Sequence, residues 1–121
     1  MVRPADIQAK YAIEREKFDE IASRESLDET AVLPPGEDFL SFARRSSYHP
    51  GIAEFLGDLD GRRVLELGCG VGHATVLLAK SGAIVSSFDI SEHSVAVTRR
   101  RAELNGVADR VDVRVAVAED L

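Results

Sequence analysis

Residues 63–91 constrain the fold of this chain more than any other stretch. A short apolar run, 64–67, is followed by three glycines, an apolar helical run over 74–79 and a second apolar run over 83–88 that ends on Asp89. This order predicts a strand, a glycine-rich turn, a helix and a second strand. Such a βαβ unit is typical of an α/β fold with a parallel sheet.

The glycine-rich turn, residues 68–72, has the composition of a ligand-binding loop. Glycines permit positive φ and leave the backbone open to a ligand, while the following helix presents unpaired N–H groups and the positive end of its dipole. The carboxyl ends of parallel strands face one crevice, so we expect Asp89 beside this loop. A carboxylate in that place can accept hydrogen bonds from two ribose hydroxyls, which indicates a nucleoside-containing cofactor.

The spacing of the glycines distinguishes between cofactors. A dinucleotide fingerprint, G-x-G-x-x-G, needs a third glycine where this chain has His73. Instead, the acid Glu66 stands two residues before G-x-G-x-G. This combination, with Asp89 after it, resembles motif I of the class I S-adenosylmethionine-dependent methyltransferases, and the resemblance extends from about residue 59 to the last.

The resemblance implies a Rossmann-like methyltransferase fold, with a parallel sheet flanked by helices, and S-adenosyl-L-methionine as the cofactor. In that family the glycine loop wraps the methionine part of the cofactor, and the acid matching Glu66 helps to hold the loop and the amino group. The carboxylate matching Asp89 binds the ribose hydroxyls, and Ile90 matches an apolar residue that packs on adenine.

The end of the chain resembles the family's third strand and the start of its adenine-contacting loop. Val117 stands where the family commonly has an acid, so a side-chain contact to the adenine amino group would have to come from Glu119 or Asp120. The expected cofactor-binding residues are Glu66, Gly68, Cys69, Gly70, Gly72, Asp89, Ile90, Ala118 and Glu119.

No catalytic residue is assigned from the sequence. Methyl transfer depends on positioning two reactants and shielding them from water, so a dedicated base is optional. Cys69 is interpreted as a small loop residue, because only His73 could serve it as a nearby base. His49, His73 and His93 share no metal-ligand spacing, so no metal site is expected. For Tyr48 and His49 a solvated or capping role is favoured over contact with substrate.

Composition narrows the functional classes. The 121 residues have a net charge of −6, with 45% hydrophobic and 30% charged residues, which fits one globular domain. The acidic balance argues against a nucleic-acid partner, and a single cysteine excludes an internal disulfide. Because the sequence has no apolar run of roughly 18 residues and no charged-then-apolar leader, we expect no membrane association and a cytoplasmic enzyme with a small-molecule methyl acceptor.

Residues 1–60 predict a helical segment that precedes the first half of the cofactor-binding domain, 61–121. Two short helices are expected over 37–45 and 52–59. Residues 4–26 predict an amphipathic helix, interpreted mainly as a packing helix, with covering of a substrate pocket as the alternative. Its apolar stripe consists of Ile7, Tyr11, Phe18, Ile21 and Ala22.

After Asp89, a helix is predicted from the N-cap Ser91 to Leu104. The run of three arginines at 99–101, near the end of this helix, is interpreted as a solvated face that stabilises the helix dipole. Residues 111–117 predict a third strand.

The sequence thus supplies three strands, whereas the family it resembles has seven. In the family's strand order, the strand at 64–67 would lie at an edge, with apolar side chains and backbone groups exposed. We therefore expect either the N-terminal part of a longer methyltransferase, truncated after the third strand, or a homodimer that completes the sheet.

Two alternative functions stay open. A nicotinamide-dependent oxidoreductase is favoured by the βαβ unit and Asp89 and opposed by His73. A non-catalytic cofactor-binding or assembly module is favoured by the short length of the chain.

Overall fold

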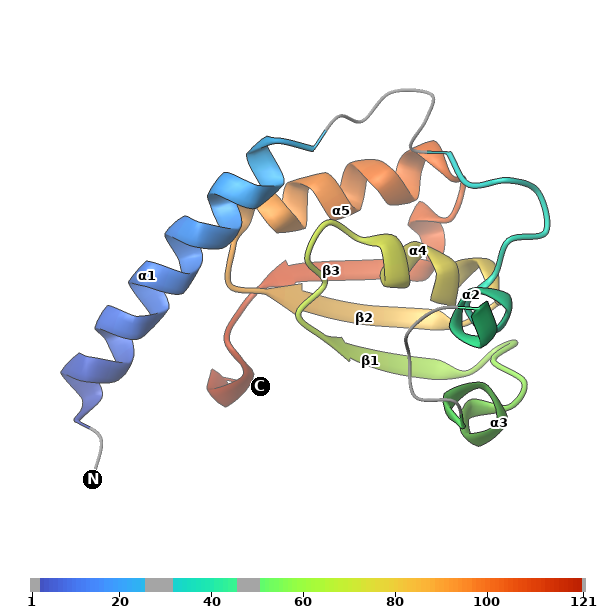
Figure 1. The fold of residues 1–121 in the computed structure, drawn as a ribbon, viewed down its shortest axis with the longest axis horizontal. Helices are drawn as coiled ribbons and strands as arrows, with labels where there is room; N and C mark the ends of the chain where they lie inside the picture. The colour runs from blue at the N-terminus through green and yellow to red at the C-terminus, as the bar shows by residue number, and fades with distance from the viewer. Residues whose placement is uncertain (1–2, 26–31, 46–50, 121) are drawn as a thin grey trace.

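The computed structural model describes residues 3–25, 32–45 and 51–120. Its centre is a parallel sheet of three strands in the order β1-β2-β3 (Figure 1). The strands are β1 (Arg63–Leu67), β2 (Ile84–Asp89) and β3 (Val111–Val115). Helix α4 (His73–Lys80) connects β1 to β2, and α5 (Glu92–Leu104) connects β2 to β3. The predicted α/β fold with a parallel sheet flanked by helices is confirmed.

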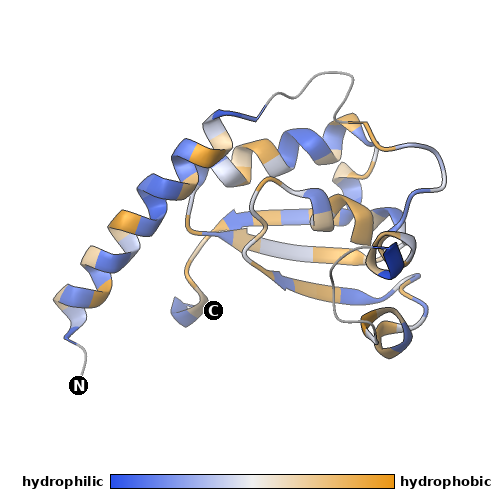
Figure 2. Cartoon of the chain, viewed as in Figure 1, coloured by the Kyte–Doolittle hydropathy of each residue, from blue (hydrophilic) through white to orange (hydrophobic). Residues whose placement is uncertain are grey.

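The main hydrophobic core lies between the sheet and α4. The strand register places Val64 opposite Val85 and Val85 opposite Val111, so these three side chains share the face that the helices cover. Val76 of α4 and Val85 are completely buried there. The high hydropathy of α4 is visible in Figure 2. Burial of this apolar helix face stabilises the packing of α4 on the sheet.

Three helices precede the sheet: α1 (Pro4–Ser23), α2 (Phe39–Arg45) and α3 (Ile52–Leu56). Helix α2 packs on α4, and α1 packs on α5 and then extends away from the sheet (Figure 1). Ala22 is the buried residue of α1, and Ile7, Phe18 and Ile21 are 36%, 37% and 45% exposed, because few of the described residues lie opposite this stripe. That α1 is mainly a packing helix stays a prediction.

Strand β1 is an edge of the described sheet, as the family's strand order predicts. Leu65 and Leu67 of β1 are 63% and 64% exposed, and Ile84 of β2 is also exposed on the same face. Helices α4 and α5 cover the opposite face. The described chain therefore presents an apolar sheet surface beside an unpaired strand edge.

Helix α5 begins and ends where the sequence predicts. Ser91 is its N-cap, and the Ser91 hydroxyl accepts a hydrogen bond of 3.0 Å from the Ser94 amide. The helix ends at Leu104, before Asn105 and Gly106. Within the described residues, none of the helices has the length and apolar character needed to cross a membrane.

Candidate cofactor-binding site

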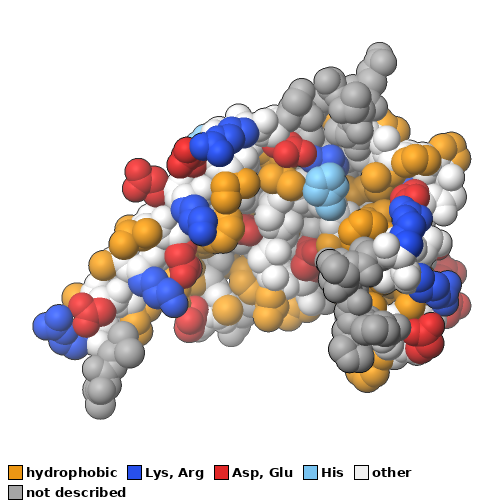
Figure 3. Space-filling model, in the orientation of Figure 1, with side chains coloured by type: hydrophobic (Ala, Val, Ile, Leu, Met, Phe, Trp, Pro, Cys, Tyr) orange, Lys and Arg blue, Asp and Glu red, His pale blue; other side chains and the backbone are white. Residues whose placement is uncertain are grey.

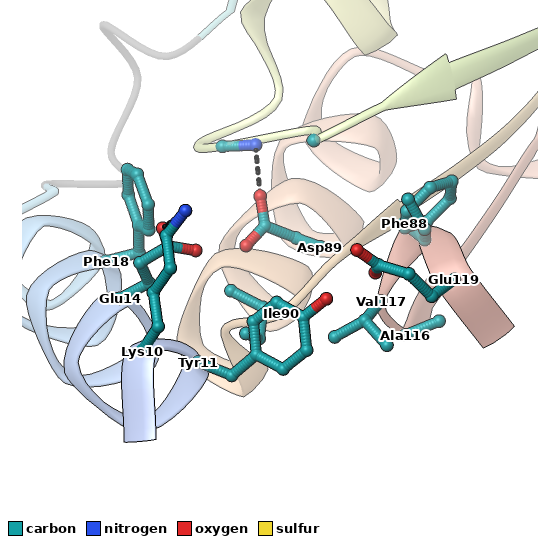
Figure 4. A pocket seen from close by; sticks show the side chains of 13 residues that line it. Lys10, Tyr11, Glu14, Phe18, Phe88, Asp89, Ile90, Ala116, Val117 and Glu119 are labelled. Atoms are coloured by element: carbon teal, nitrogen blue, oxygen red, sulfur yellow. Dashed lines mark hydrogen bonds and ion pairs between the residues drawn. The ribbon is translucent and has the colours of Figure 1, made fainter. Parts of the chain in front are cut away.

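A cavity of about 440 Å³ lies between α1 and the carboxyl ends of the strands (Figure 4). Its volume falls within the range of about 300–1,000 Å³ that is typical of small-molecule sites. Asp89 stands on one side of it, and side chains of α1 stand on another. The lining residues are Lys10, Tyr11, Glu14, Phe18, Gly68, Gly70, Phe88, Asp89, Ile90, Ala116, Val117, Ala118 and Glu119.

The glycine loop gives the cavity a wall of bare backbone. Gly68 and Gly70 have φ values of 77° and 54°, in the left-handed region that favours glycine. A Cβ at either position would meet no other atom within 4 Å, although both residues line the cavity. A side chain here would therefore take up space that a ligand can occupy.

Asp89 is held in a fixed orientation by two backbone amides. Its Oδ2 accepts a hydrogen bond from the Gly70 amide and its Oδ1 accepts one from the Ser91 amide, both at 3.0 Å. The residue is only 8% exposed. A carboxylate offers about four acceptor positions, so two stay available for hydroxyl donors in the cavity.

The wall opposite the glycine loop is mostly apolar. It is formed by Ile90, directly after β2, and by residues 116–118, which lead from β3 into the short 3₁₀ helix η3 (Ala118–Asp120). A flat aromatic ring has apolar contacts available on this side. The predicted residues Ala118 and Glu119 also line the cavity.

Tyr11 of α1 reaches Glu119 at the edge of the cavity (Figure 4). The Tyr11 phenol interacts with the Glu119 carboxylate, and this interaction raises the pKa of Tyr11 to about 12 and holds the pKa of Glu119 below its usual range. The contact agrees with the alternative interpretation of the N-terminal helix, in which it covers a pocket.

The C-terminal half of α1 is hydrogen-bonded to the segment that follows β2. The Asp19 carboxylate accepts hydrogen bonds from the Ser91 hydroxyl and, at 3.4 Å, from the His93 amide. Arg15 donates to the carbonyl of Ile90 at 3.3 Å. These contacts place the α1 wall relative to Asp89. Side chains of both charge signs alternate along the outer surface of α1 (Figure 3).

Three of the predicted residues, Glu66, Cys69 and Gly72, do not line the cavity. Glu66 lies under α4, where its Oε1 accepts hydrogen bonds from Thr75 at 2.5 Å and from Ser87 at 2.8 Å. The carboxylate therefore ties β1 to α4 and β2. In this structure its contacts are those of a residue that supports the loop.

Cys69 and Gly72 pack on the inner side of the loop. Burial raises the pKa of the Cys69 thiol to about 11, so the thiol is protonated at neutral pH and is a poor nucleophile. Gly72 is the N-cap of α4 with a φ of 90°, and a Cβ at this position would lie 3.0 Å from atoms of Thr98. Only glycine allows the loop to approach α5 this closely.

Two residues of α5 hold the carbonyl groups of the loop. The Thr98 hydroxyl donates a hydrogen bond to the Gly70 carbonyl at 3.0 Å, and Nε of Arg101 donates to the Val71 carbonyl at 2.8 Å. Neither residue is predicted from the sequence as part of the site. The only signal in the sequence is their spacing, because positions 98 and 101 continue the inward face of α5 that begins at Val95.

The interpretation of the arginine run as a solvated face is wrong for Arg101. This residue is 3% exposed, whereas Arg100 is exposed and forms an ion pair with Glu103. Arg99 donates to the Val113 carbonyl at 2.7 Å. The helical period explains the difference, since it turns position 101 toward the glycine loop and position 100 toward solvent.

The remaining predictions concern histidines and Tyr48. Tyr48 and His49 lie outside the described residues. His73 is exposed on the first turn of α4, and His93 lies 3.3 Å from the Asp19 carboxylate. In the part of the chain that the structure describes, no group of three His, Cys, Asp or Glu side chains is arranged to hold a metal ion.

A parallel βαβ unit with an open glycine loop and a carboxylate at the ends of its strands defines an α/β protein of the nucleotide-cofactor-binding class. Comparison with known families narrows this class. Residues 58–121 match a family described as "Methyltransferase domain". The chain belongs to this family, and the predicted Rossmann-like methyltransferase fold and family resemblance are confirmed.

Individual relatives agree with the family. The chain is 39% identical over 70 residues to a ubiquinone biosynthesis O-methyltransferase of Bordetella avium, a match that covers 58% of this chain and 28% of that protein. It is 47% identical over 53 residues to the ribosomal RNA small subunit methyltransferase C of Chromohalobacter salexigens, with 44% of this chain and 16% of that protein covered.

A solved structure similar to this chain is also a methyltransferase. The SAM-dependent methyltransferase from Geobacter sulfurreducens in complex with S-adenosyl-L-homocysteine superimposes with a TM-score of 0.54 and 29% identity, covering 83% of this chain and 36% of that one. The matches cover 28% of the Bordetella avium protein and 36% of the Geobacter sulfurreducens protein, so the chain spans only about a third of the length of either. The comparisons do not favour the nicotinamide-dependent alternative.

Proposed function

We propose that this chain forms the cofactor-binding part of an S-adenosylmethionine-dependent methyltransferase. The orientation of Asp89 is the observation that carries the proposal. Its carboxylate faces the cavity, fixed by the amides of Gly70 and Ser91, at the place where a ribose diol would be recognised.

Other residues of the cavity fit the remaining parts of this cofactor. The exposed backbone of Gly68 and Gly70 would lie against the methionine part, and Ile90 and Val117 would contact the adenine ring. Ala118 and Glu119 would border that ring. When bound, S-adenosylmethionine supplies a methyl group on a positively charged sulfur. The chain's own contribution is to orient the cofactor and exclude water from it.

Glu66, Cys69 and Gly72 would act indirectly. Glu66 would hold the start of the loop through Thr75 and Ser87, and Gly72 would allow α5 to approach. Cys69 would fill the space under the loop as a neutral thiol. We assign no catalytic residue within this chain.

We propose a small molecule as the methyl acceptor. The net charge of −6 disfavours a polyanionic acceptor. The Bordetella avium relative is a ubiquinone biosynthesis O-methyltransferase, and it matches a larger share of this chain than the relative that is named as a ribosomal RNA methyltransferase. A filter-binding assay with RNA at low salt would test this point, and tight, salt-sensitive binding would contradict it.

Titration calorimetry with S-adenosylhomocysteine tests the proposed cofactor. We expect binding by the native chain and binding at least about tenfold weaker for Asp89→Asn, because the ribose would lose a charged acceptor. Asp112→Asn is the matched control, since Asp112 is an exposed strand residue outside the cavity that pairs with Arg114. A folded chain that binds NADH and not S-adenosylhomocysteine would overturn the proposal.

The exposed edge of β1 supports a further part of the proposal. We propose that residues 61–121 are the first half of a cofactor-binding domain whose sheet is completed beyond β1, either by further strands of a longer protein or by a second copy. Leu65 and Leu67 would be covered in either case. Analytical ultracentrifugation separates the cases, because a sheet completed by a second copy makes this chain a dimer. A stable monomer that unfolds cooperatively would contradict both.

A further inference from the structure

Arg101 is a buried cation that no part of the proposed cofactor chemistry uses. Its side chain is 4% exposed, and it has two partners from distant parts of the chain. Its Nε donates to the Val71 carbonyl at 2.8 Å, and its terminal Nη2 pairs with the Glu25 carboxylate. A buried guanidinium is tolerated only when charge and donors are satisfied, so both contacts are needed to keep it there.

The two partners of Arg101 do not line the cavity, but each adjoins a segment that does. Val71 is the residue after Gly70 in the glycine loop, and Glu25 lies just beyond the end of α1, the helix that carries Tyr11 and Phe18. The guanidinium has a planar fork of donors in fixed directions. A change in the position of Glu25 therefore changes the direction in which Nε points at the loop.

The neighbouring contacts make the loop sensitive to this direction. Gly70 is held at its amide by Asp89 and at its carbonyl by Thr98, one helical turn before Arg101 on α5. Asp89 thus fixes the peptide group between residues 69 and 70, and Thr98 fixes the one between residues 70 and 71. Arg101 fixes the next peptide group through the Val71 carbonyl. His73 also lies 4.0 Å from the Glu25 carboxylate, so the same acid faces the first residue of α4.

We propose that Arg101 is a positioning residue that couples the end of α1, through Glu25, to the Val71 carbonyl of the glycine loop and thereby sets the affinity of the cofactor site. This inference rests on the proposed function, because it assumes that the loop contacts the cofactor. It predicts that disturbing Glu25, which does not line the cavity, weakens cofactor binding.

Calorimetric titration of the whole chain with S-adenosylhomocysteine tests the coupling. Arg101→Lys keeps the charge but replaces the planar fork with a single ammonium group, which cannot reproduce both contacts. We expect at least about tenfold weaker binding for this variant and a loss of about threefold or more for Glu25→Gln. The double variant should lose little more than Arg101→Lys, because both changes break one linkage.

Arg100→Lys is the matched control. Arg100 lies on the same helix, is exposed and pairs with Glu103. The affinity of this variant for S-adenosylhomocysteine should therefore stay within about threefold of that of the native chain. Melting temperatures are measured alongside. If Arg101→Lys and Glu25→Gln lower the melting temperature but bind S-adenosylhomocysteine as tightly as the native chain, the role is merely structural and the proposal is overturned. If Arg101→Lys does not fold, Glu25→Gln decides.

Glycine amide resonances give a second readout that needs no ligand. We expect Glu25→Gln to shift the resonances of Gly70 and Gly72 in the free chain, and Arg100→Lys to leave them in place. Unshifted resonances in Glu25→Gln would overturn the coupling. Failure of the native chain to bind S-adenosylhomocysteine would instead overturn the proposed function, so the two failures are distinguishable.

Discussion

The amide of Gly70 donates a hydrogen bond of 3.0 Å to the Asp89 carboxylate, although the two residues are 19 positions apart. This contact joins the loop after β1 to the end of β2, and these two strands are neighbours in the sheet. The carbonyl of the same glycine is held by Thr98. The geometry of the loop is therefore set by side chains on β2 and α5 as much as by the glycines themselves.

Thr98→Val should weaken both the fold and the site. The substitution keeps the shape of a completely buried side chain and leaves the Gly70 carbonyl without its donor, which costs about 1–2 kcal/mol of the free energy of unfolding. Urea denaturation measures this change, and calorimetry should show a several-fold loss of affinity for S-adenosylhomocysteine. Thr98→Ser, which retains the hydroxyl, should keep native affinity. Equal losses in both variants would speak against a role for the hydrogen bond.

Gly68→Ala and Gly106→Ala form a matched pair. Both glycines have positive φ, 77° and 71°, and a Cβ would meet no atom within 4 Å at either. Each substitution should cost about 1–2 kcal/mol in backbone strain. Only Gly68 lines the cavity, so only Gly68→Ala should lower the affinity for S-adenosylhomocysteine, by at least about tenfold. Similar affinities for the two variants would place the ligand elsewhere.

Cys69 should make stability fall at alkaline pH. Burial raises the thiol pKa from 9.0 to about 11, so the folded state holds its proton after the unfolded state has released it. The resulting stabilisation is fully present below pH 9 and is lost as pH rises toward 11. Between pH 8 and pH 10 it should decrease by about 1 kcal/mol. Urea unfolding at both pH values measures this loss, which should be absent in Cys69→Ala; a loss of the same size in that variant would assign the effect to other groups.

The contact between Tyr11 and Glu119 should be visible in a tyrosine titration. The Glu119 carboxylate raises the pKa of Tyr11 to about 12, so Glu119→Gln should return that pKa toward 10. Phenolate absorbance reports the change when Tyr48→Phe removes the second tyrosine. Asp120→Asn should have a smaller effect, because Asp120 acts on Tyr11 only through its charge. An unchanged titration in Glu119→Gln would contradict the placement of α1 beside η3.

The type and order of the elements from β1 to β3 could be predicted because local signals agree with one another. Apolar runs of strand length, three glycines and the Ser91 N-cap all point to the same arrangement. Gly68, Gly70, Asp89, Ile90, Ala118 and Glu119 were also predicted as site residues, and all six line the cavity. Their roles toward a cofactor stay predictions.

The support of the site could not be predicted in the same way. Thr98 and Arg101 act by donating hydrogen bonds to backbone carbonyls about 30 residues away, and a carbonyl leaves no trace in the sequence. The three consecutive arginines cannot be told apart in the sequence, yet the helical period gives each a different environment. The contribution of Tyr11 depends on the path of α1, which no local signal fixes.

Within the described residues, the groups outside the glycine loop that hydrogen-bond to it follow it in the chain, and this has a consequence for synthesis on the ribosome. Amides of the loop are bound by Phe88 and Asp89, and its carbonyls by Thr98 and Arg101. When the loop first leaves the exit tunnel, none of these groups is available to it. The nascent chain therefore acquires its ligand-binding geometry only after α5 has emerged, and an added cofactor can stabilise the chain only from that length onward.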